Sequence, residues 1–179
     1  MPHSIITRLF TFYRLLAGCV VCFVILHANN APAQESQKGS VSGLPLPRYV
    51  SLKSDRVNVR EGPSKEHPTV WIYTRAALPV EITAEFETWR KIRDWEGAEG
   101  WVLHSLLSGR RTALAAPSKK EPLVLTDKDR RTPVVKLAPG VIGALRSCDG
   151  KWCRLTGKDF DGYIQQENLW GVYPGEKIE

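Results

Sequence analysis

Histidine and cysteine are the residue types best suited to catalysis, and their positions in this chain argue against it. Beyond residue 33 the chain contains two histidines, His67 and His104, and two cysteines, Cys148 and Cys153. A Cys–His nucleophile needs a free thiolate with a histidine within reach, whereas these cysteines lie close to each other in another part of the chain. His104 precedes Ser105, but neither an acidic partner nor a nucleophile elbow accompanies the pair. Because no phosphate-binding glycine loop or carboxylate pair stands out either, we predict a protein that is not an enzyme and needs no cofactor.

Three polar residues, by contrast, are spaced for binding. Arg56, Asn58 and Arg60 alternate with two valines, so a strand would place all three on one face. Their side chains are hydrogen-bond donors suited to carboxylates, and we predict that they contribute to a ligand-binding site. Two other interpretations stay open: the row is a solvated strand face, or an arginine fixes the turn that follows. Gly62, in that turn, is expected to serve a backbone conformation that other residues resist.

The tryptophans are the second group of candidate binding residues. All six lie beyond residue 33, at positions 71, 89, 95, 101, 152 and 170, and tryptophan serves in cores and at binding surfaces alike. Trp95 lies in the polar stretch RDWE, where a core position is hard to arrange, so we predict an exposed ligand contact. Trp89 lies on the opposite strand face from Ile92 unless a bulge intervenes, so one of the two is predicted to face a groove. For Trp101 and Trp152 the sequence favours packing.

The first 33 residues have the pattern of an export signal. Arg8 and Arg14 precede an apolar run at residues 15–26, and a polar stretch after it ends in APA at residues 31–33. This order is typical of a cleaved signal peptide, and the run is shorter than the ~20 apolar residues of a membrane-spanning helix. We predict a periplasmic or secreted bacterial protein with no stable membrane span. Two alternatives stay open: lipidation at Cys19 in the lipobox-like stretch LAGC, and retention as an uncleaved anchor.

Export favours a disulfide between the two remaining cysteines. Cys148 and Cys153 flank Asp149 and Gly150, a strong signal for a two-residue hairpin turn. A two-residue loop would pair Cys148 with Lys151 and leave Cys153 on the diagonal, near the limit of disulfide reach. A longer loop would place the cysteines opposite each other. The region offers too few ligands for a metal, so we predict a Cys148–Cys153 disulfide and no metal site.

The net charge does not indicate a nucleic-acid partner. The formal net charge is +6, and beyond residue 33 the chain has 23 basic and 19 acidic residues, a net charge of +4. Proteins that bind nucleic acid usually concentrate positive charge on one face or element, whereas here the basic residues cluster only in pairs. We therefore predict no nucleic-acid partner.

Short strands are the elements that must position these residues. Alternating or apolar runs recur roughly every eight to twelve residues between glycine and proline turns, which is typical of a small all-β barrel or sandwich. A single 3₁₀ turn is expected at residues 104–106. The order WRKI, GWV and leucine at residues 89–107 recurs as WCRL, GYI and leucine at residues 152–169. This shared spacing predicts a duplicated structural unit.

The two copies resemble a known family. Residues 56–64 (RVNVREGPS) resemble the N-x-R-x-G-P signature that opens bacterial SH3-like (SH3b) domains, and residues 89–102 resemble their W-x-x-V…G-W-V closing half. The second copy keeps the closing half and lacks the opening signature, and residues 169–176 (LWGVYPGE) resemble exported bacterial proteins with two copies. The resemblance implies an all-β fold with two tandem small SH3-like β-barrels, from a family that often accompanies cell-wall hydrolases and binds peptidoglycan or its peptide cross-bridges. The aromatic pairs that grip proline-rich helices in eukaryotic SH3 domains are not recognisable.

Together these observations predict a domain order and a function. The order is a signal peptide at 1–33, a flexible leader at 34–49, one SH3-like domain at 50–114, a linker at 115–122 and a second SH3-like domain at 123–176. We predict a non-enzymatic binding module of the cell envelope that recognises peptidoglycan or a wall peptide. Its predicted ligand contacts are Arg56, Asn58, Arg60, Trp89 and Trp95, and the first copy, which has the opening signature, is the predicted binder. The alternative is a periplasmic adaptor that binds an envelope protein through its edge strands or aromatic surface.

Overall fold

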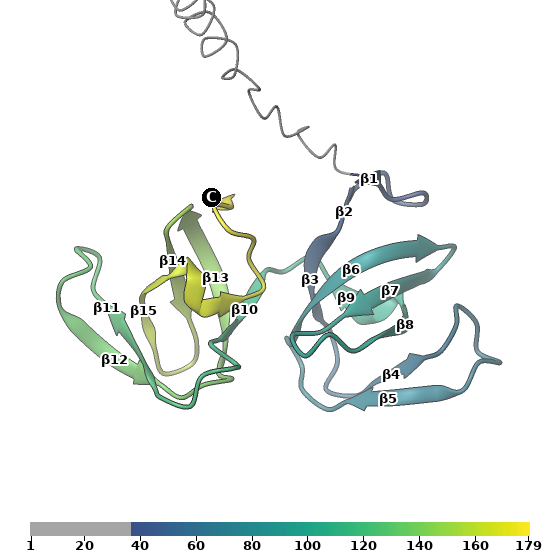
Figure 1. Cartoon of the computed structure of the whole chain (residues 1–179), viewed down its shortest axis with the longest axis horizontal. Helices are drawn as coiled ribbons and strands as arrows, with labels where there is room; N and C mark the ends of the chain where they lie inside the picture. Colours follow the sequence, from purple (N-terminus) through teal and green to yellow (C-terminus); the bar gives the residue numbers. More distant parts are fainter. Residues whose placement is uncertain (1–36) are drawn as a thin grey trace, which may run out of the picture. The chain divides into compact units, whose positions relative to one another are not determined.

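The described part of the chain is built almost entirely of β-strands (Figure 1). The computed structural model describes residues 37–179, and the predicted signal peptide lies outside them. Within this range there is no α-helix, and the helical turns are the 3₁₀ helices η2 (His104–Leu106) and η3 (Gln166–Asn168). No helix in the described range is long and apolar enough to cross a membrane. The 3₁₀ turn expected at residues 104–106 is confirmed by η2.

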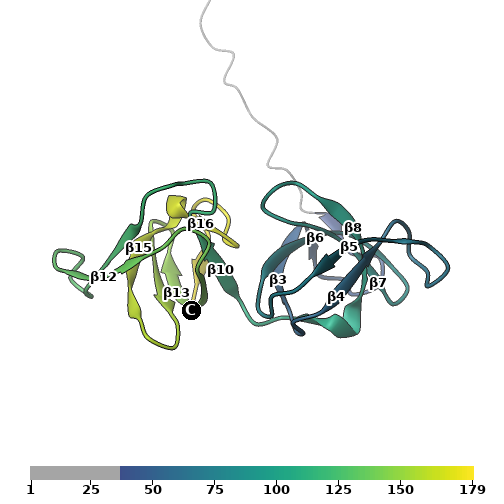
Figure 2. The same ribbon diagram turned by 90° about the horizontal axis from the view of Figure 1, so that it is seen from below.

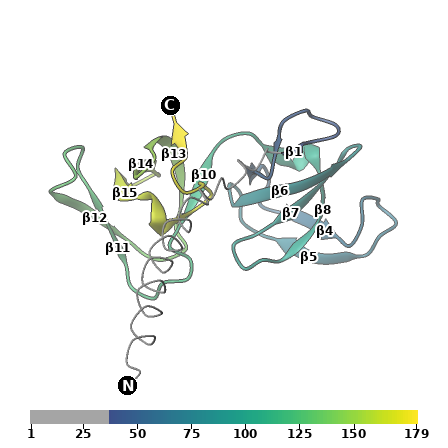
Figure 3. The same ribbon diagram turned by 45° about the horizontal axis from the view of Figure 1, so that its top comes forward.

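The first barrel is a seven-stranded sheet in the order β5-β4-β8-β7-β6-β3-β9. Its strands are β3 (Arg48–Leu52), β4 (Val57–Arg60), β5 (Thr69–Tyr73), β6 (Pro79–Phe86), β7 (Trp89–Arg93), β8 (Glu99–Leu103) and β9 (Leu107–Ser108). Strands β6, β7 and β8 lie side by side as an antiparallel meander (Figure 3). The sheet closes on a core that includes Val57, Val80, Ile92 and Val102, each at most 1% exposed.

The second barrel repeats this architecture. Its sheet runs in the order β12-β11-β15-β14-β13-β10-β16, with β17 paired to β13. The strands are β10 (Thr112–Ala115), β11 (Leu123–Thr126), β12 (Pro133–Leu137), β13 (Ile142–Asp149), β14 (Trp152–Thr156), β15 (Asp161–Gln165), β16 (Leu169–Trp170) and β17 (Lys177–Ile178). Position by position this order matches that of the first sheet, and a 3₁₀ helix follows the sixth strand of each along the chain. The predicted duplication is therefore confirmed, as is the fold class of two small SH3-like barrels.

Strand β10 extends the second sheet into the region that we assigned to the first domain. It pairs with β13 and β16 (Figure 2). Side chains alternate across a strand, so Ala113 and Ala115 belong to the second core while Leu114, 1% exposed, belongs to the first. The second sheet therefore begins at residue 112, before the linker predicted at 115–122, and it includes β17, which ends at residue 178. A strand read by itself does not reveal which sheet it will join.

The disulfide forms across a hairpin with the longer of the two loops considered. Cys148 lies directly opposite Cys153 in the register of β13 and β14, and the two residues are disulfide-bonded with their Cα atoms 4.1 Å apart. The carboxylate of Asp149 accepts hydrogen bonds from the N–H groups of Lys151 and Trp152. Gly150 has φ +97°, which favours glycine. These features hold a four-residue loop that brings the cysteines together.

The segment before the first barrel is held by a buried glutamate. Residues 37–46, which we expected to be part of a flexible leader, form the paired strands β1 (Gln37–Lys38) and β2 (Pro45–Leu46). The carboxylate of Glu85 accepts hydrogen bonds from the N–H groups of Val41 and Ser42, the Ser42 hydroxyl and the Arg48 guanidinium. These contacts, made more than 35 residues away in sequence, order a segment whose composition alone suggested flexibility.

Candidate ligand-binding site

A pocket on the first barrel brings together four of the five residues that the sequence nominated. It has a volume of about 230 Å³. Its lining comprises the predicted Arg56, Asn58, Arg60 and Trp89, together with Lys65, Leu103 and Leu106. The β4 strand, the following loop, the start of β7 and helix η2 all contribute to it. We call it the cationic pocket.

Strand alternation produces the polar side of the cationic pocket. Val57 and Val59 of β4 are 0% and 3% exposed and face the core, so Arg56, Asn58 and Arg60 face outward. Arg60 donates a hydrogen bond of 2.6 Å to the carbonyl oxygen of His67. It therefore fixes the loop, as one of the alternative interpretations proposed, and also lines the pocket.

The remaining polar groups of the cationic pocket are uncommitted. Within residues 37–179 the side chains of Arg56, Asn58 and Lys65 make no hydrogen bond, and neither they nor Arg60 form an ion pair. No carboxylate lines the pocket. Three positive charges therefore converge on a space without a negative group.

Trp89 forms the apolar side of the cationic pocket. It is 7% exposed and outside the core cluster, whereas Ile92 is 1% exposed and inside it. The two residues therefore face opposite sides of β7, and Trp89 faces the groove. Trp89 lies opposite Leu103 in the register of β7 and β8, and Leu106 of η2 lies beside them in the pocket wall.

The loop above the pocket is packed tightly around a glycine. A Cβ added to Gly62 would lie 2.3 Å from His67 Nε2, and Gly62 is not among the residues with positive φ. Its role is therefore to make room for the imidazole, which corrects the expectation of a special backbone conformation. In the same loop, hydrogen bonds from the Ser64 hydroxyl and the backbone lower the pKa of Glu66, assisted by the charges of His67 and Arg60.

Trp95, the fifth nominated residue, lies outside the cationic pocket. It is 36% exposed and belongs to the turn between β7 and β8, at the opposite end of β7 from Trp89. The buried carboxylate of Asp94 shapes this turn by accepting hydrogen bonds from the N–H groups of Glu96 and Ala98 and from the Tyr73 hydroxyl. At ~3.3 Å per residue, β7 spans roughly 13 Å from Trp89 to Arg93, and Trp95 lies beyond its far end.

Other surface features were missed or misjudged from the sequence. Trp101 and Trp152, for which packing was favoured, are half-buried and belong to neither core cluster. Trp101 lies on the outward face of β8, between the buried Gly100 and Val102. Trp152 is the first residue of β14, and the next residue, Cys153, is buried. On edge strand β5, Val70, Trp71 and Ile72 are 52%, 55% and 40% exposed. The sequence indicated an apolar strand at β5. Its side chains are exposed because β5 lies at the edge of the sheet.

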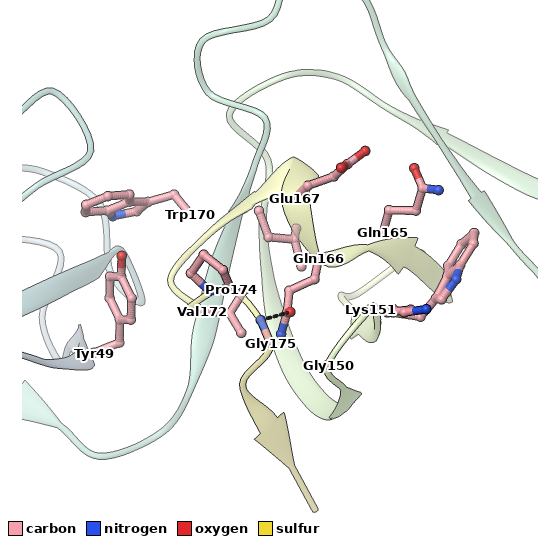
Figure 4. A pocket seen from close by; sticks show the side chains of 12 residues that line it. Tyr49, Gly150, Lys151, Gln165, Gln166, Glu167, Trp170, Val172, Pro174 and Gly175 are labelled. Carbon is pink, nitrogen blue, oxygen red and sulfur yellow. Dashed lines mark hydrogen bonds between the residues drawn. The ribbon is translucent and has the colours of Figure 1, made fainter. Parts of the chain in front are cut away.

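A larger hollow of about 570 Å³ lies beside the second barrel (Figure 4). It is lined mainly by residues 150–152, 165–167 and 169–175, with Tyr49 from the first barrel. None of the nominated binding residues contributes to it. The described residues contain no group of three or more histidine, cysteine, aspartate or glutamate side chains arranged to hold a metal ion.

The family model described as bacterial SH3 domain matches residues 53–109 and 126–171, together more than half of the chain. The chain belongs to the bacterial SH3 domain family. No curated protein matched it in the comparison. Bacterial SH3 domains are commonly modules that bind the cell wall or other proteins. The matched ranges lie within the two barrels, and the first contains the whole cationic pocket.

Proposed function

We propose that this protein is an exported binding module of the cell envelope whose first barrel recognises peptidoglycan through a carboxylate-bearing wall peptide. The observation that carries the proposal is the cationic pocket, where uncommitted positive side chains surround an apolar wall. Membership of the bacterial SH3 domain family supports a binding role for the protein. The disulfide between Cys148 and Cys153 is compatible with an oxidising compartment outside the cytoplasm.

The chemistry of the cationic pocket suits a short acidic peptide. Guanidinium groups bind carboxylates through charge-assisted, often bidentate hydrogen bonds, and no group among residues 37–179 engages the side-chain donors of Arg56. Trp89 and Leu103 offer apolar surface to the methyl or methylene groups that lie beside a peptide carboxylate. A volume of about 230 Å³ is below the ~300–1,000 Å³ of pockets that enclose drug-sized ligands, so the pocket would take one side of a peptide and not a whole molecule.

Co-sedimentation with isolated sacculi tests this function. We expect Arg56→Gln to weaken sedimentation about tenfold, which corresponds to the loss of one hydrogen-bonded charge contact. Arg110→Gln is the matched control, because Arg110 is exposed and lies outside the cationic pocket. Binding should also fall with added salt, since the pocket is open to solvent. Equal sedimentation of the two variants would refute the assignment of this pocket.

Trp95 is proposed as a separate contact for the same polymer. If the cell-wall polymer lies along the β7–β8 hairpin, Trp95→Ala should weaken sedimentation on sacculi, and the contact with Arg56 should remain. If only Arg56→Gln has an effect, the ligand is confined to the cationic pocket.

A protein partner is the second candidate function, and the exposed edge strand β5 favours it. An edge strand presents unpaired backbone groups to which a partner strand can add, and Val70, Trp71 and Ile72 add exposed apolar surface. Crosslinking in cells distinguishes the two functions. A discrete protein captured by wild type and lost in Trp71→Ser, without sedimentation on sacculi, would replace wall binding with the adaptor role.

A further inference from the structure

The larger hollow on the second barrel is formed by several separate segments of the chain. Three of its walls come from different parts of the chain: the turn at residues 150–151, the end of β15 with η3, and the C-terminal segment at residues 172–175. Figure 4 shows that the Gln166 side chain is turned toward Gly175, whereas Gln165 and Glu167 extend away from that segment. We call this space the C-terminal hollow.

Partly buried hydrogen bonds hold the C-terminal wall of the hollow in place. Gln166, 5% exposed, donates to the carbonyl oxygen of Glu176 at 2.8 Å and accepts from the Gly175 N–H at 2.9 Å. The Glu176 carboxylate pairs with Arg111 at 2.6 Å and accepts from the Tyr173 N–H at 2.8 Å. Strand β17 then pairs with β13. Because these contacts fix the segment before any ligand arrives, the hollow is preorganised.

The first barrel has no counterpart of this wall. Trp152 occupies in β14 the place that Trp89 occupies in β7, since each opens the fourth strand of its ordered sheet. The outward row of Arg56, Asn58 and Arg60 is absent from the second copy, where Val124 is 43% exposed on β11. The second barrel therefore lacks the cationic row, and its tryptophan lines the C-terminal hollow instead.

The polar groups around the C-terminal hollow carry one charge of each sign. Lys151, Gln165 and Glu167 are exposed, and within residues 37–179 their side chains take part in no hydrogen bond or ion pair. Trp152 adds a half-buried aromatic wall. The Arg130 guanidinium lies 5.4 Å from the centre of the Trp152 ring and supports it. The rim thus offers hydrogen-bond donors, acceptors and an indole without a net charge.

We infer that the C-terminal hollow is a second binding site, and that its ligand is a neutral carbohydrate whose sugar ring packs against Trp152 while its hydroxyl groups bind Gln165, Glu167 and Lys151. The indole face is electron-rich and attracts the C–H groups of a sugar ring. Hydroxyl groups both donate and accept, which matches an amide, a carboxylate and an ammonium at one rim. The volume of about 570 Å³ lies within the ~300–1,000 Å³ of small-molecule sites.

Other ligand classes match this rim less well. A polyanion would meet a single cation, Lys151, together with the like charge of Glu167. A proline-rich peptide offers mainly carbonyl acceptors because proline has no N–H, so the Glu167 carboxylate would lose water without gaining a donor. A sugar satisfies both groups. This site is independent of the cationic pocket, and it adds a glycan contact to the peptide contact proposed there.

Titration of the purified full chain with a soluble β-1,4-linked N-acetylglucosamine tetramer tests the inference. Intrinsic tryptophan fluorescence and calorimetry would report binding. We expect saturable binding that weakens about tenfold in Trp152→Ala, as for the loss of one stacked aromatic contact. Gln165→Ala and Glu167→Gln, at exposed positions without intramolecular partners in the described range, should weaken it severalfold with an unchanged melting temperature. These two variants keep the test informative if Trp152→Ala fails to fold.

The controls separate this inference from the first-barrel function. Arg56→Gln should leave binding of the tetramer unchanged while it reduces sedimentation on sacculi. No binding of the tetramer at millimolar concentration, or binding that is insensitive to Gln165→Ala and Glu167→Gln, would overturn the inference. Preferential binding of a proline-rich decapeptide that is lost in the same variants would also overturn it and identify the hollow as a peptide site.

Discussion

Replacing Glu85 by glutamine is predicted to release the segment at residues 39–48 from the first barrel. The side chain of Glu85 is fully buried and forms ion pairs with Arg48 at 2.6 Å and Arg90 at 3.4 Å. It also accepts hydrogen bonds from the N–H groups of Val41 and Ser42 at 3.0 and 2.8 Å. Glutamine can accept only part of this set, and it leaves two arginines without a counter-charge.

The pKa of Glu85 sets the magnitude. Burial raises the pKa of this carboxyl, but hydrogen bonds from Ser42, Arg48 and Val41 outweigh it and lower the pKa from 4.5 to about 2. A difference of this size between folded and unfolded chains is equivalent to about 3 kcal/mol of stability. Because the folded pKa is the lower one, this stabilisation is fully present above about pH 5 and is lost as the pH falls from 4.5 toward 2.

Urea unfolding of wild type and Glu85→Gln at several pH values between 2 and 7 measures this contribution. We expect the variant to be less stable by about 2–3 kcal/mol at pH 7. The difference should shrink toward pH 2, where Glu85 is protonated in the unfolded chain and about half protonated in the folded one. Glu99→Gln is the matched control, because its ion pair with Lys91 is more than one-third exposed and should contribute at most about 1 kcal/mol. Hydrogen exchange at the Val41 and Ser42 amides should accelerate in Glu85→Gln alone. A stability difference that does not change with pH, or unchanged exchange at these amides, would refute the reasoning.

Two further predictions concern the barrels themselves. Replacing both Cys148 and Cys153 by serine should destabilise the second barrel by about 2 kcal/mol, the chain-entropy value for so short a loop. Reducing agent should lower the melting temperature of wild type but not of the double variant. Equal melting temperatures of reduced and oxidised wild type would contradict this prediction. Gly100→Ala should destabilise the first barrel by about 1–3 kcal/mol through overpacking, because the added Cβ would lie 2.3 Å from a Val59 methyl carbon. Gly109→Ala is its matched control, since nothing lies within 4 Å of the added atom, and similar urea midpoints for the two alanine variants would show that the contact with Val59 relaxes freely.

The cationic pocket shows how far local patterns reach. The alternation around Val57 and Val59 was sufficient to place Arg56, Asn58 and Arg60 on one outward face, because strand side chains alternate regardless of the sheet that the strand joins. The sequence could not show that Trp89 completes the same pocket while Trp95 does not. Strands β4 and β7 are separated by β8 in the sheet, so their approach depends on the curvature of the closed barrel.

The sequence alone determined the all-β class, the duplication and the pairing of Cys148 with Cys153, because strand alternation, repeat spacing and turn residues act over a few neighbouring positions. Only the tertiary structure decided which sheet β10 joins, that Glu85 holds a leader some forty residues earlier, and that Gln166 anchors the wall of the C-terminal hollow. These contacts depend on buried polar groups that find partners far along the chain. The sequence around a polar residue does not show which distant backbone group will form a hydrogen bond with it. That hydrogen bond is determined only when the barrels pack.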